Sequence, residues 1–361
     1  MGHAWGRAAE SQAFPPICVG SARGRSRTNE PGPRAGTNAP AREDVTMSGH
    51  SVVAEIVRSG FVEGHHRGSV VRVAPGGEVA WSVGDITSAI YPRSCNKPVQ
   101  AATMVDLGLE LRGSLLALGA ASHSGERFHL DGVRKVLDGA GLDEGALQTP
   151  PDLPYGEQAR IAYLRAGRER SAIAMNCSGK HAAMLATCVT NGWDTDAYLD
   201  PAHPLQVAIA ERFSGLTGES IASTGVDGCG APLLSTSLTG LARAFSRFAQ
   251  ASPESAEGLV AAAISGSPEY ASGTQRDECA LIKAFPGSIA KSGAEAVYAV
   301  ALPDGTAFAC KIEDGADRAR PIVMADAMRI AGYASPVLDE QATQTLLGGG
   351  EPVGEIRSTL R

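Results

Sequence analysis

After residue 50 the hydrophobic residues first gather in three short runs that are typical of β-strands. These runs are VVAEIVR (52–58), GSVVRVA (68–74) and EVAWSVG (78–84), and all three are rich in β-branched residues. The turn sequence PGG separates the second run from the third. The pattern predicts an antiparallel meander.

Beyond Pro98 the apolar residues recur with the period of an α-helix. In VQAATMVDLGL (99–109) they return along one helical face. Comparable patterns continue to about residue 285 and are broken by glycine and proline. They occur in GKHAAMLATCVTNG (179–192), HPLQVAIAERFSGLTG (203–218), APLLSTSLTGLARAFSRFAQ (231–250) and SAEGLVAAAISG (255–266).

Strand-like runs return near residue 294. AEAVYAVAL (294–302) and TAFACKIE (306–313) flank the tripeptide PDG, a strong hairpin signal, and an amphipathic helix follows in RPIVMADAMRIAGYA (320–334). The simplest assembly is an α+β fold in which both ends of the chain build one antiparallel sheet. The helical insert, about residues 98–285, then forms a second lobe, and we expect a substrate cleft between the lobes.

The first 46 residues show neither the alternation of apolar residues that is typical of strands nor the period of a helix. They consist mainly of Arg, Gly, Pro, Ser and Ala, which predicts a disordered tail or a misassigned start, with residues 47–361 as the folded domain. Their longest apolar stretch, FPPICVG, is too short and too interrupted by proline for the core of a signal peptide.

Composition narrows the class of protein. The 361 residues carry a net charge of -7, which argues against a surface for nucleic acid or for an anionic membrane. No apolar run approaches the roughly 18 residues that a membrane span requires. The seven cysteines are scattered along the chain, which favours a reducing cytoplasm over a disulfide scaffold.

Lysine is scarce, since only six of the 32 basic residues are lysines. Arginine keeps its proton and cannot serve as a general base, whereas a buried lysine can lose its proton. Three lysines, at positions 97, 180 and 291, stand in serine- and glycine-rich contexts. These are the positions at which we expect chemistry that needs a titratable amine.

Ser94 and Lys97 form a Ser-x-x-Lys motif. On a helix, residues three apart share a face, so the amine would lie near the hydroxyl. Pro98 suits only a first helical turn, which places Ser94 near a helix amino terminus, where the dipole favours a developing oxyanion. A desolvated Lys97 could then accept the Ser94 proton. Taken alone, the short motif more often marks a helix cap followed by a surface lysine.

Two further segments fit a serine-lysine site. Lys291 opens the sequence KSG before a strand, much as the Lys-Thr-Gly of penicillin-recognising enzymes lies opposite their Ser-x-x-Lys helix. Ser122, within ASHSGE (121–126), is a candidate proton relay. A loop lysine before a strand and a polar turn are the plain alternatives.

Two glycine-rich turns, MNCSGKHAAML (175–185) and TGVDGCGAP (224–232), could converge. They supply Cys177, Lys180, Asp227 and Cys229. Two cysteines suit zinc, but no second Cys-x-x-Cys or His pair completes a tetrahedral set, and a lysine ligand would have to be neutral. Buried structural thiols are the alternative.

Five of these motifs together resemble one known family. RSCNKPVQ, SHSGE, NCSGKHAAML, GVDGCGAP and AKSGAEAVYA occur in this order in the rhizobial-type, thermolabile L-asparaginase II family, and the resemblance runs from about residue 52 to 333. It implies an L-asparagine amidohydrolase, usually a homodimer. It also implies a fold similar to serine β-lactamases, penicillin-binding proteins and glutaminases.

The resemblance also implies roles for individual residues. Two serine-lysine pairs are expected: Ser94 with Lys97 as nucleophile and base, and Ser122 with Lys291 assisting from the facing side. The expected lining of the substrate pocket is Arg93, Lys180 and Asp227. The expected zinc ligands are Cys177, Lys180 and Cys229, although the chemistry itself requires no cofactor.

The expected reaction is acyl transfer through a serine. Asp227 is a candidate for binding the α-ammonium of the substrate, and Arg93 for binding its α-carboxylate. Which serine attacks first stays open, as does the preference between asparagine and glutamine. The rival functions are a glutaminase or β-lactam-type hydrolase and, in a different class, a non-catalytic amino-acid-binding protein.

Overall fold

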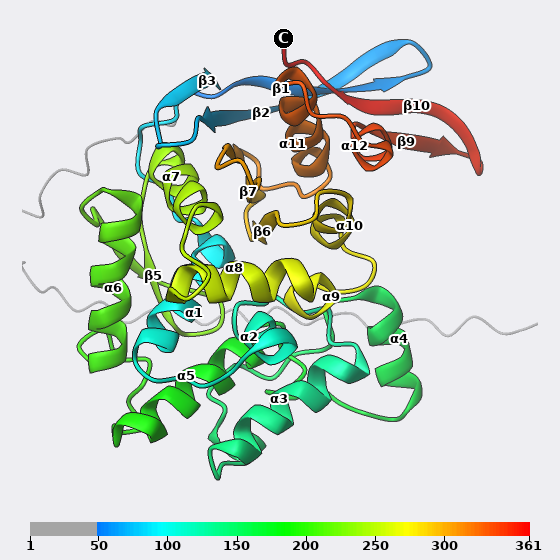
Figure 1. Ribbon diagram of the computed structural model, residues 1–361. Coiled ribbons are helices and arrows are strands. Elements are labelled where there is room, and N and C mark those ends of the chain that lie inside the picture. The colour runs from blue at the N-terminus through cyan, green and yellow to red at the C-terminus, as the bar shows by residue number, and fades with distance from the viewer. Residues whose placement is uncertain (1–48) are drawn as a thin grey trace, which may run out of the picture. The chain divides into compact units, whose positions relative to one another are not determined.

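The computed structural model describes residues 49–361, so the predicted tail lies outside the described residues (Figure 1). Within this range, eight strands form one sheet in the order β6-β7-β8-β2-β1-β10-β9, with β3 paired to β2. A separate hairpin joins β4 to β5. The strands are β1 (Ser51–Arg58), β2 (Phe61–Val73), β3 (Val79–Val83), β4 (Thr224–Val226), β5 (Pro232–Leu234), β6 (Ile289–Gly293), β7 (Val297–Ala301), β8 (Ala307–Ile312), β9 (Thr343–Gly348) and β10 (Glu351–Ser358).

Most of the helices lie between β3 and β6. The α-helices are α1 (Lys97–Asp106), α2 (Gly113–Gly119), α3 (Arg127–Gly139), α4 (Glu157–Arg165), α5 (Ser178–Asn191), α6 (Pro204–Thr217), α7 (Leu238–Ala249), α8 (Ala256–Gly266), α9 (Pro268–Ala271), α10 (Asp277–Ala284), α11 (Ala319–Ile330) and α12 (Pro336–Gln341). Two short 3-10 helices are η1 (Arg93–Asn96) and η2 (Glu144–Ala146). Within residues 49–361, none of the helices has both the length and the apolar character that crossing a membrane demands.

The α+β fold class predicted from the sequence is confirmed. The antiparallel sheet combines β1–β3 from the early part of the chain with β6–β10 from the late part, and the segment between them is mainly helical. The predicted meander forms, and the PDG sequence joins β7 to β8 as a hairpin.

Two features differ from the expectation. β9 and β10 were not predicted, because most of their residues are exposed or half-buried and no regular alternation of apolar and polar side chains marks them in the sequence. Pairing with β1 instead stabilises β10. The helix expected over residues 231–250 begins only at α7, since its first residues form β5 and the Ser237 hydroxyl accepts the Gly240 N–H as an N-cap.

The half of the sheet that carries β6 is the most deeply buried. Every residue of β6, β7 and β8 is buried, so both faces of this region are covered. α7 and α11 both pack on β8. This rigid region places the end of β6 next to η1 and the start of α1.

The start of α5 lies directly against α2. A Cβ atom on Gly179 would lie 2.6 Å from the carbonyl oxygen of Leu118 and 2.7 Å from its Cγ atom. Only glycine permits this approach of the two helices. The contact determines where the neighbours of Gly179 lie, including Cys177 and Lys180.

Gly179→Ala should therefore lower the free energy of unfolding by about 1–3 kcal/mol, because the added methyl group overpacks a backbone contact. Gly215→Ala is the matched control, since no heavy atom lies within 4 Å of a Cβ at this position in α6. Alanine there should raise the free energy of unfolding by up to about 1 kcal/mol. Urea unfolding measures both variants, and equal values would contradict the close approach of α5 to α2.

Candidate active site

A cavity of about 330 Å³ lies where η1, the loop before α3, the start of α5, the β4–β5 turn and the end of β6 meet. Six of the nine predicted site residues line it. They are Arg93, Ser94, Ser122, Cys177, Asp227 and Cys229. The other three, Lys97, Lys180 and Lys291, are buried just behind the wall, with at most 2% of each residue exposed.

Ser94 follows a residue with strained backbone. Arg93 has a φ of 51°, in the left-handed region that costs a non-glycine residue about 1 kcal/mol or more. This sharp turn leads the chain into η1. Gly293 at the end of β6 leaves room for it, because a Cβ atom there would lie 2.7 Å from the Pro92 oxygen and 3.2 Å from the Ser94 nitrogen. Ser94 is therefore held at the cavity wall by its own turn and by β6.

The amine of Lys97 is fully buried and has three partners. Its Nζ atom donates to the carbonyl oxygen of Ala121 at 2.5 Å, to Oγ of Ser122 at 2.9 Å and to Sγ of Cys177 at 3.1 Å. Among the described residues, no side-chain hydrogen bond joins Lys97 to Ser94; only the backbone N–H of Lys97 bonds to the Ser94 oxygen. The structure thus pairs Lys97 with Ser122, which differs from the expected pairing.

Lys291 lies in β6 and donates from Nζ to the carbonyl oxygen of Ser292 at 2.8 Å. Its expected partner, Ser122, is hydrogen-bonded to Lys97 instead. Burial lowers the pKa of Lys291 to about 8, although the nearby Glu278 carboxylate acts in the opposite direction. Lys291 is therefore a lysine whose amine becomes neutral at mildly alkaline pH.

Two of the predicted substrate-binding residues, Arg93 and Asp227, are paired with each other. Nε of Arg93 donates to Oδ1 of Asp227 at 2.8 Å. Burial alone would raise the pKa of Asp227, but this hydrogen bond and the charges of Lys180, Arg93 and Lys97 together lower it. Lys180 donates from Nζ to Sγ of Cys229 at 3.1 Å. Burial would lower the pKa of Lys180, but the cysteine charges raise it.

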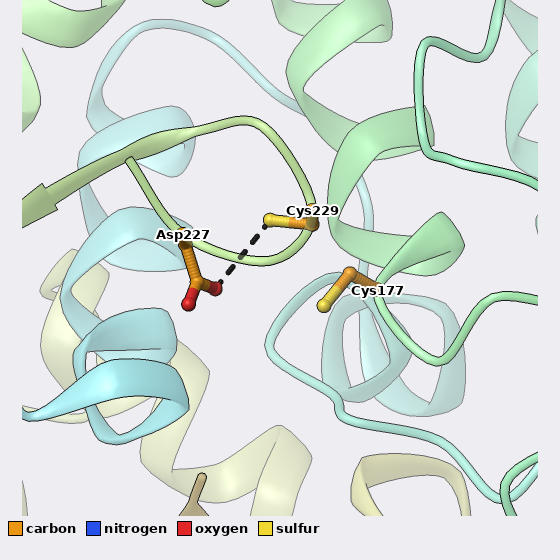
Figure 2. Close-up of side chains that lie close together, drawn as sticks. All are labelled: Cys177, Asp227 and Cys229. Carbon is orange, nitrogen blue, oxygen red and sulfur yellow. Dashed lines mark hydrogen bonds between the residues drawn. The ribbon is translucent and has the colours of Figure 1, made fainter. Parts of the chain in front are cut away.

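Cys177, Asp227 and Cys229 form a compact cluster of possible metal ligands (Figure 2). Their donor atoms all lie within 4.8 Å of one another. A hydrogen bond from Cys229 and the charges of Lys97 and Lys180 hold the pKa of Cys177 well below its usual value, despite its burial. Two sulfurs and a carboxylate oxygen are donors that fit zinc, whereas the nitrogen of Lys180, whose pKa is raised, would have to lose its proton before it could bind the metal.

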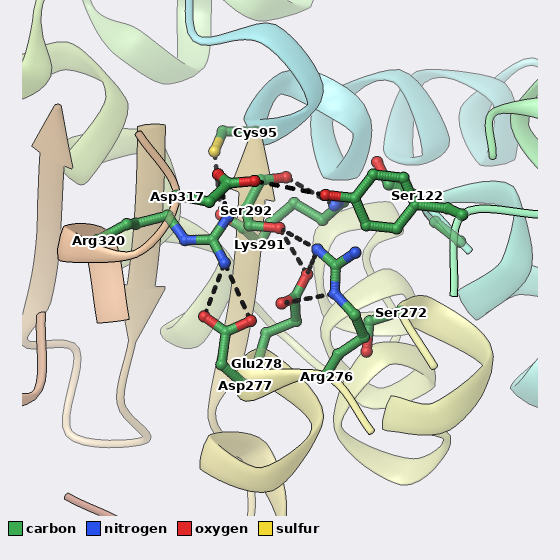
Figure 3. A network of polar contacts seen from close by, with 12 residues as sticks. Cys95, Ser122, Ser272, Arg276, Asp277, Glu278, Lys291, Ser292, Asp317 and Arg320 are labelled. Carbon is green, nitrogen blue, oxygen red and sulfur yellow. Dashed lines mark hydrogen bonds and ion pairs between the residues drawn. The ribbon is translucent and has the colours of Figure 1, made fainter. Parts of the chain in front are cut away.

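A buried network of ions, which the sequence did not reveal, joins Arg276 and Arg320 of the cavity wall to the carboxylates of Glu278 and Asp277 (Figure 3). Nη2 of Arg276 donates to Oε1 of Glu278 at 3.2 Å and to Oγ of Ser292 at 2.9 Å, while Ser292 donates to Glu278 at 2.7 Å. Burial would raise the pKa of Glu278, but the Arg276 charge holds it well below its usual range. Nearby, Arg320 binds both carboxylate oxygens of Asp277.

These network residues gave no signal in the sequence. Asp277 and Glu278 open α10, and acidic residues are ordinary in a first helical turn. Arg276 directly precedes α10, but Ser292 lies on β6 and Arg320 on α11, so only the folded chain completes the network. Burial raises the pKa of Asp277 to about 7, with a further contribution from the Glu278 charge.

Comparison with known proteins gives one family match and several distant structural likenesses. The family model described as L-asparaginase II matches residues 54–358. No curated protein is similar enough in sequence to count as a match. A β-lactamase from Mycobacterium bovis is 15% identical with a TM-score of 0.41, and the match covers 74% of this chain and 95% of that chain.

Two further solved structures are comparably distant. Mglu in its native form is 14% identical with a TM-score of 0.40, over 74% of this chain and 63% of that chain. A Bacillus subtilis glutaminase, solved as a covalent complex with 5-oxo-L-norleucine, is 13% identical with a TM-score of 0.32. That match covers 68% of this chain and 79% of the glutaminase.

The lowered pKa of Lys291 is directly measurable because the chain has only six lysines. With 15N-labelled lysine, one Nζ resonance should titrate near pH 8 and should be absent from Lys291→Arg. The spectrum of Lys283→Arg, which changes an exposed lysine, should keep it. A protein in which every lysine titrates near the ordinary value of about 10.4 would contradict the prediction.

Proposed function

The chain belongs to the L-asparaginase II family and is an amidohydrolase, and on this premise we propose that it hydrolyses the side-chain amide of L-asparagine. The products are ammonia and L-aspartate. The observation that carries the proposal is the cavity itself: Ser94 and Ser122 line it, and the buried amines of Lys97 and Lys291 lie immediately behind it. Two hydroxyls backed by two amines suit acyl transfer at an amide.

We propose Ser94 as the nucleophile. Its hydroxyl attacks the amide carbon, its proton passes to a neutral lysine amine, and the backbone N–H of Ser94, at a helix start, donates to the oxyanion. The lysine returns the proton to the departing nitrogen, which leaves as ammonia. A water molecule then cleaves the aspartyl ester and restores the serine.

Ser122 has a defined part in this scheme. Lys97 donates to three acceptors, which uses every N–H of an ammonium group. Once Lys97 is neutral, its lone pair must face a donor. The Ser122 hydroxyl at 2.9 Å is able to reverse its role and donate, which leaves it placed to relay a proton.

A comparison of substrates tests the proposed function. The protein should release ammonia from L-asparagine with a higher kcat/KM than from L-glutamine, and it should not open a chromogenic β-lactam. Faster turnover of glutamine or of the β-lactam would favour the rival hydrolase functions. Thermal stabilisation by L-asparagine without any ammonia release would show a binding protein instead.

Ser94→Ala should lower kcat for ammonia release by about 10⁴-fold or more, since the bond-forming group is lost. Ser214→Ala, in α6 and away from the cavity, is the matched control and should retain full activity. Circular dichroism and the melting temperature of both variants should match those of the parent protein. Retained activity in Ser94→Ala would remove Ser94 as the nucleophile.

We also propose that zinc binds to Cys177, Lys180 and Cys229. A bound zinc ion would act as a Lewis acid and would favour the deprotonated forms of its ligands. The two cysteines come from the start of α5 and the β4–β5 turn. Both segments line the cavity, so a zinc ion bound by these ligands would keep the two segments in a fixed relative position.

Metal analysis of the purified protein should find about one zinc per chain. Cys177→Ala and Cys229→Ala should each lower the zinc content at least about tenfold. Cys188→Ala, which changes another buried free cysteine of α5, should leave it unchanged. Zinc content that is equal in all three variants would contradict this site.

A further inference from the structure

The charges on the cavity wall are unequally distributed. Three guanidinium groups and three carboxylates line it. They are Arg93, Arg276 and Arg320, and Asp227, Glu295 and Asp317. An amino-acid substrate carries both an ammonium and a carboxylate, so these side chains decide which way round it binds. The question deepens the proposed function and rests on it.

At the Arg93 end of the cavity, one lining guanidinium group already lies beside two carboxylates. Arg93 contacts two carboxylates, Asp227 at 2.8 Å and Glu295 at 3.7 Å. A third carboxylate, brought by a substrate, would be repelled there. An ammonium group would instead be attracted to the carboxylate oxygens of Asp227 and Glu295. This end therefore suits the α-ammonium.

Arg276 offers what a carboxylate needs. Nε and Nη2 are engaged by Glu278 and Ser292, which fixes the plane of the guanidinium group. Nη1 makes no hydrogen bond within residues 49–361, yet it is not among the buried atoms that lack a partner. Since Arg276 lines the cavity, the two N–H groups of Nη1 open into it.

The surroundings of Arg276 hold it rigidly. Its side chain is only 14% exposed, and its guanidinium carbon lies 4.7 Å from the centre of the Tyr155 ring. Two further cations, Lys291 and Arg320, lie close enough to influence it or its partner Glu278. The carboxylates of Glu278 and Asp277 also lie close, so what suits Arg276 to bind a carboxylate is its fixed plane and its open Nη1.

Arg320 is the less suitable third candidate. Its Nη atoms are engaged by Asp277 and Asp317. Its Nε atom is buried and has no partner, so it is closed off from the cavity. Arg320 therefore supports the wall without an open donor on Nε.

We infer that Arg276 binds the α-carboxylate of the substrate through Nη1, while Asp227 and Glu295 attract its α-ammonium. The role expected for Arg93 from the sequence changes accordingly, from binding the carboxylate to neutralising Asp227. The substrate then spans the cavity between these two ends, with its amide facing the two serines.

Three amides that differ only in their α-groups test this orientation. They are L-asparagine, succinamic acid, which lacks the α-amino group, and 3-aminopropanamide, which lacks the α-carboxylate. In Arg276→Met, kcat/KM for asparagine and for succinamic acid should fall by about 100-fold, as expected for lost charge-assisted hydrogen bonds. The value for 3-aminopropanamide should change by less than about threefold, because it has no carboxylate to lose.

The controls separate this role from a structural one. Arg212→Met removes another part-buried arginine, which is ion-paired to two carboxylates and is not part of the cavity lining. It should change kcat/KM only slightly, and by the same factor for all three amides. Arg276→Lys keeps the cation and most of the volume, so it should fold and show an intermediate, about tenfold loss for the two carboxylate-bearing amides. The ratio between substrates is independent of the fraction of protein that folds.

Other results would overturn the inference. An equal fall for all three amides in both Arg276 variants would make Arg276 a support for the wall only. In Arg93→Met, kcat/KM could instead fall only for the two amides that carry a carboxylate, while Arg276→Lys shows no such selective fall. That result would assign the carboxylate to Arg93. If the parent protein released ammonia from none of the amides, the proposed function itself would fail, which is distinguishable from either result.

Discussion

The burial of three lysine amines around one cavity is the constraint on which the rest of this structure depends. A buried cation is costly unless its charge and its hydrogen-bond donors are matched, or unless it loses its proton. Lys97 is matched by a carbonyl, a hydroxyl and a thiol, and Lys180 by the thiol of Cys229. Lys291 donates to one carbonyl oxygen and is attracted by the Glu278 carboxylate, but its burial still lowers its pKa to about 8.

The partners of these amines come from segments that are far apart in the chain, so satisfying them also assembles the cavity. β6 supplies Lys291 and presses Gly293 against the turn that presents Ser94. Ser292, between them, joins Arg276 to Glu278. A change at the end of this one strand would therefore affect the proposed nucleophile, a candidate base and the proposed carboxylate site together.

The sequence predicted the parts of the fold and site that local patterns encode. The meander, the PDG hairpin and the helical insert follow from period and turn chemistry, and Ser94, Ser122 and the two cysteines were found through short motifs. The Arg276–Glu278 network was missed because its members look like an ordinary helix start, and their burial arises from contacts with β6. The Ser-x-x-Lys motif also did not predict the hydrogen-bond partner of Lys97, because spacing along a helix does not tell which of several nearby acceptors an amine binds. The homodimer and the cytoplasmic location stay predictions.

The pairing of β1 with β10 has a consequence for how the protein is made. Ala54 lies opposite Ser358, so β1 leaves the ribosome about 300 residues before the strand that covers its edge. At about 5–20 residues per second, that interval is roughly 15–60 s. During this time β1 has β2 on one side and an open row of backbone donors and acceptors on the other, where a neighbouring nascent chain could pair. Completion of the sheet is thus a late event in synthesis, and the yield of folded protein depends on how well that edge is shielded until then.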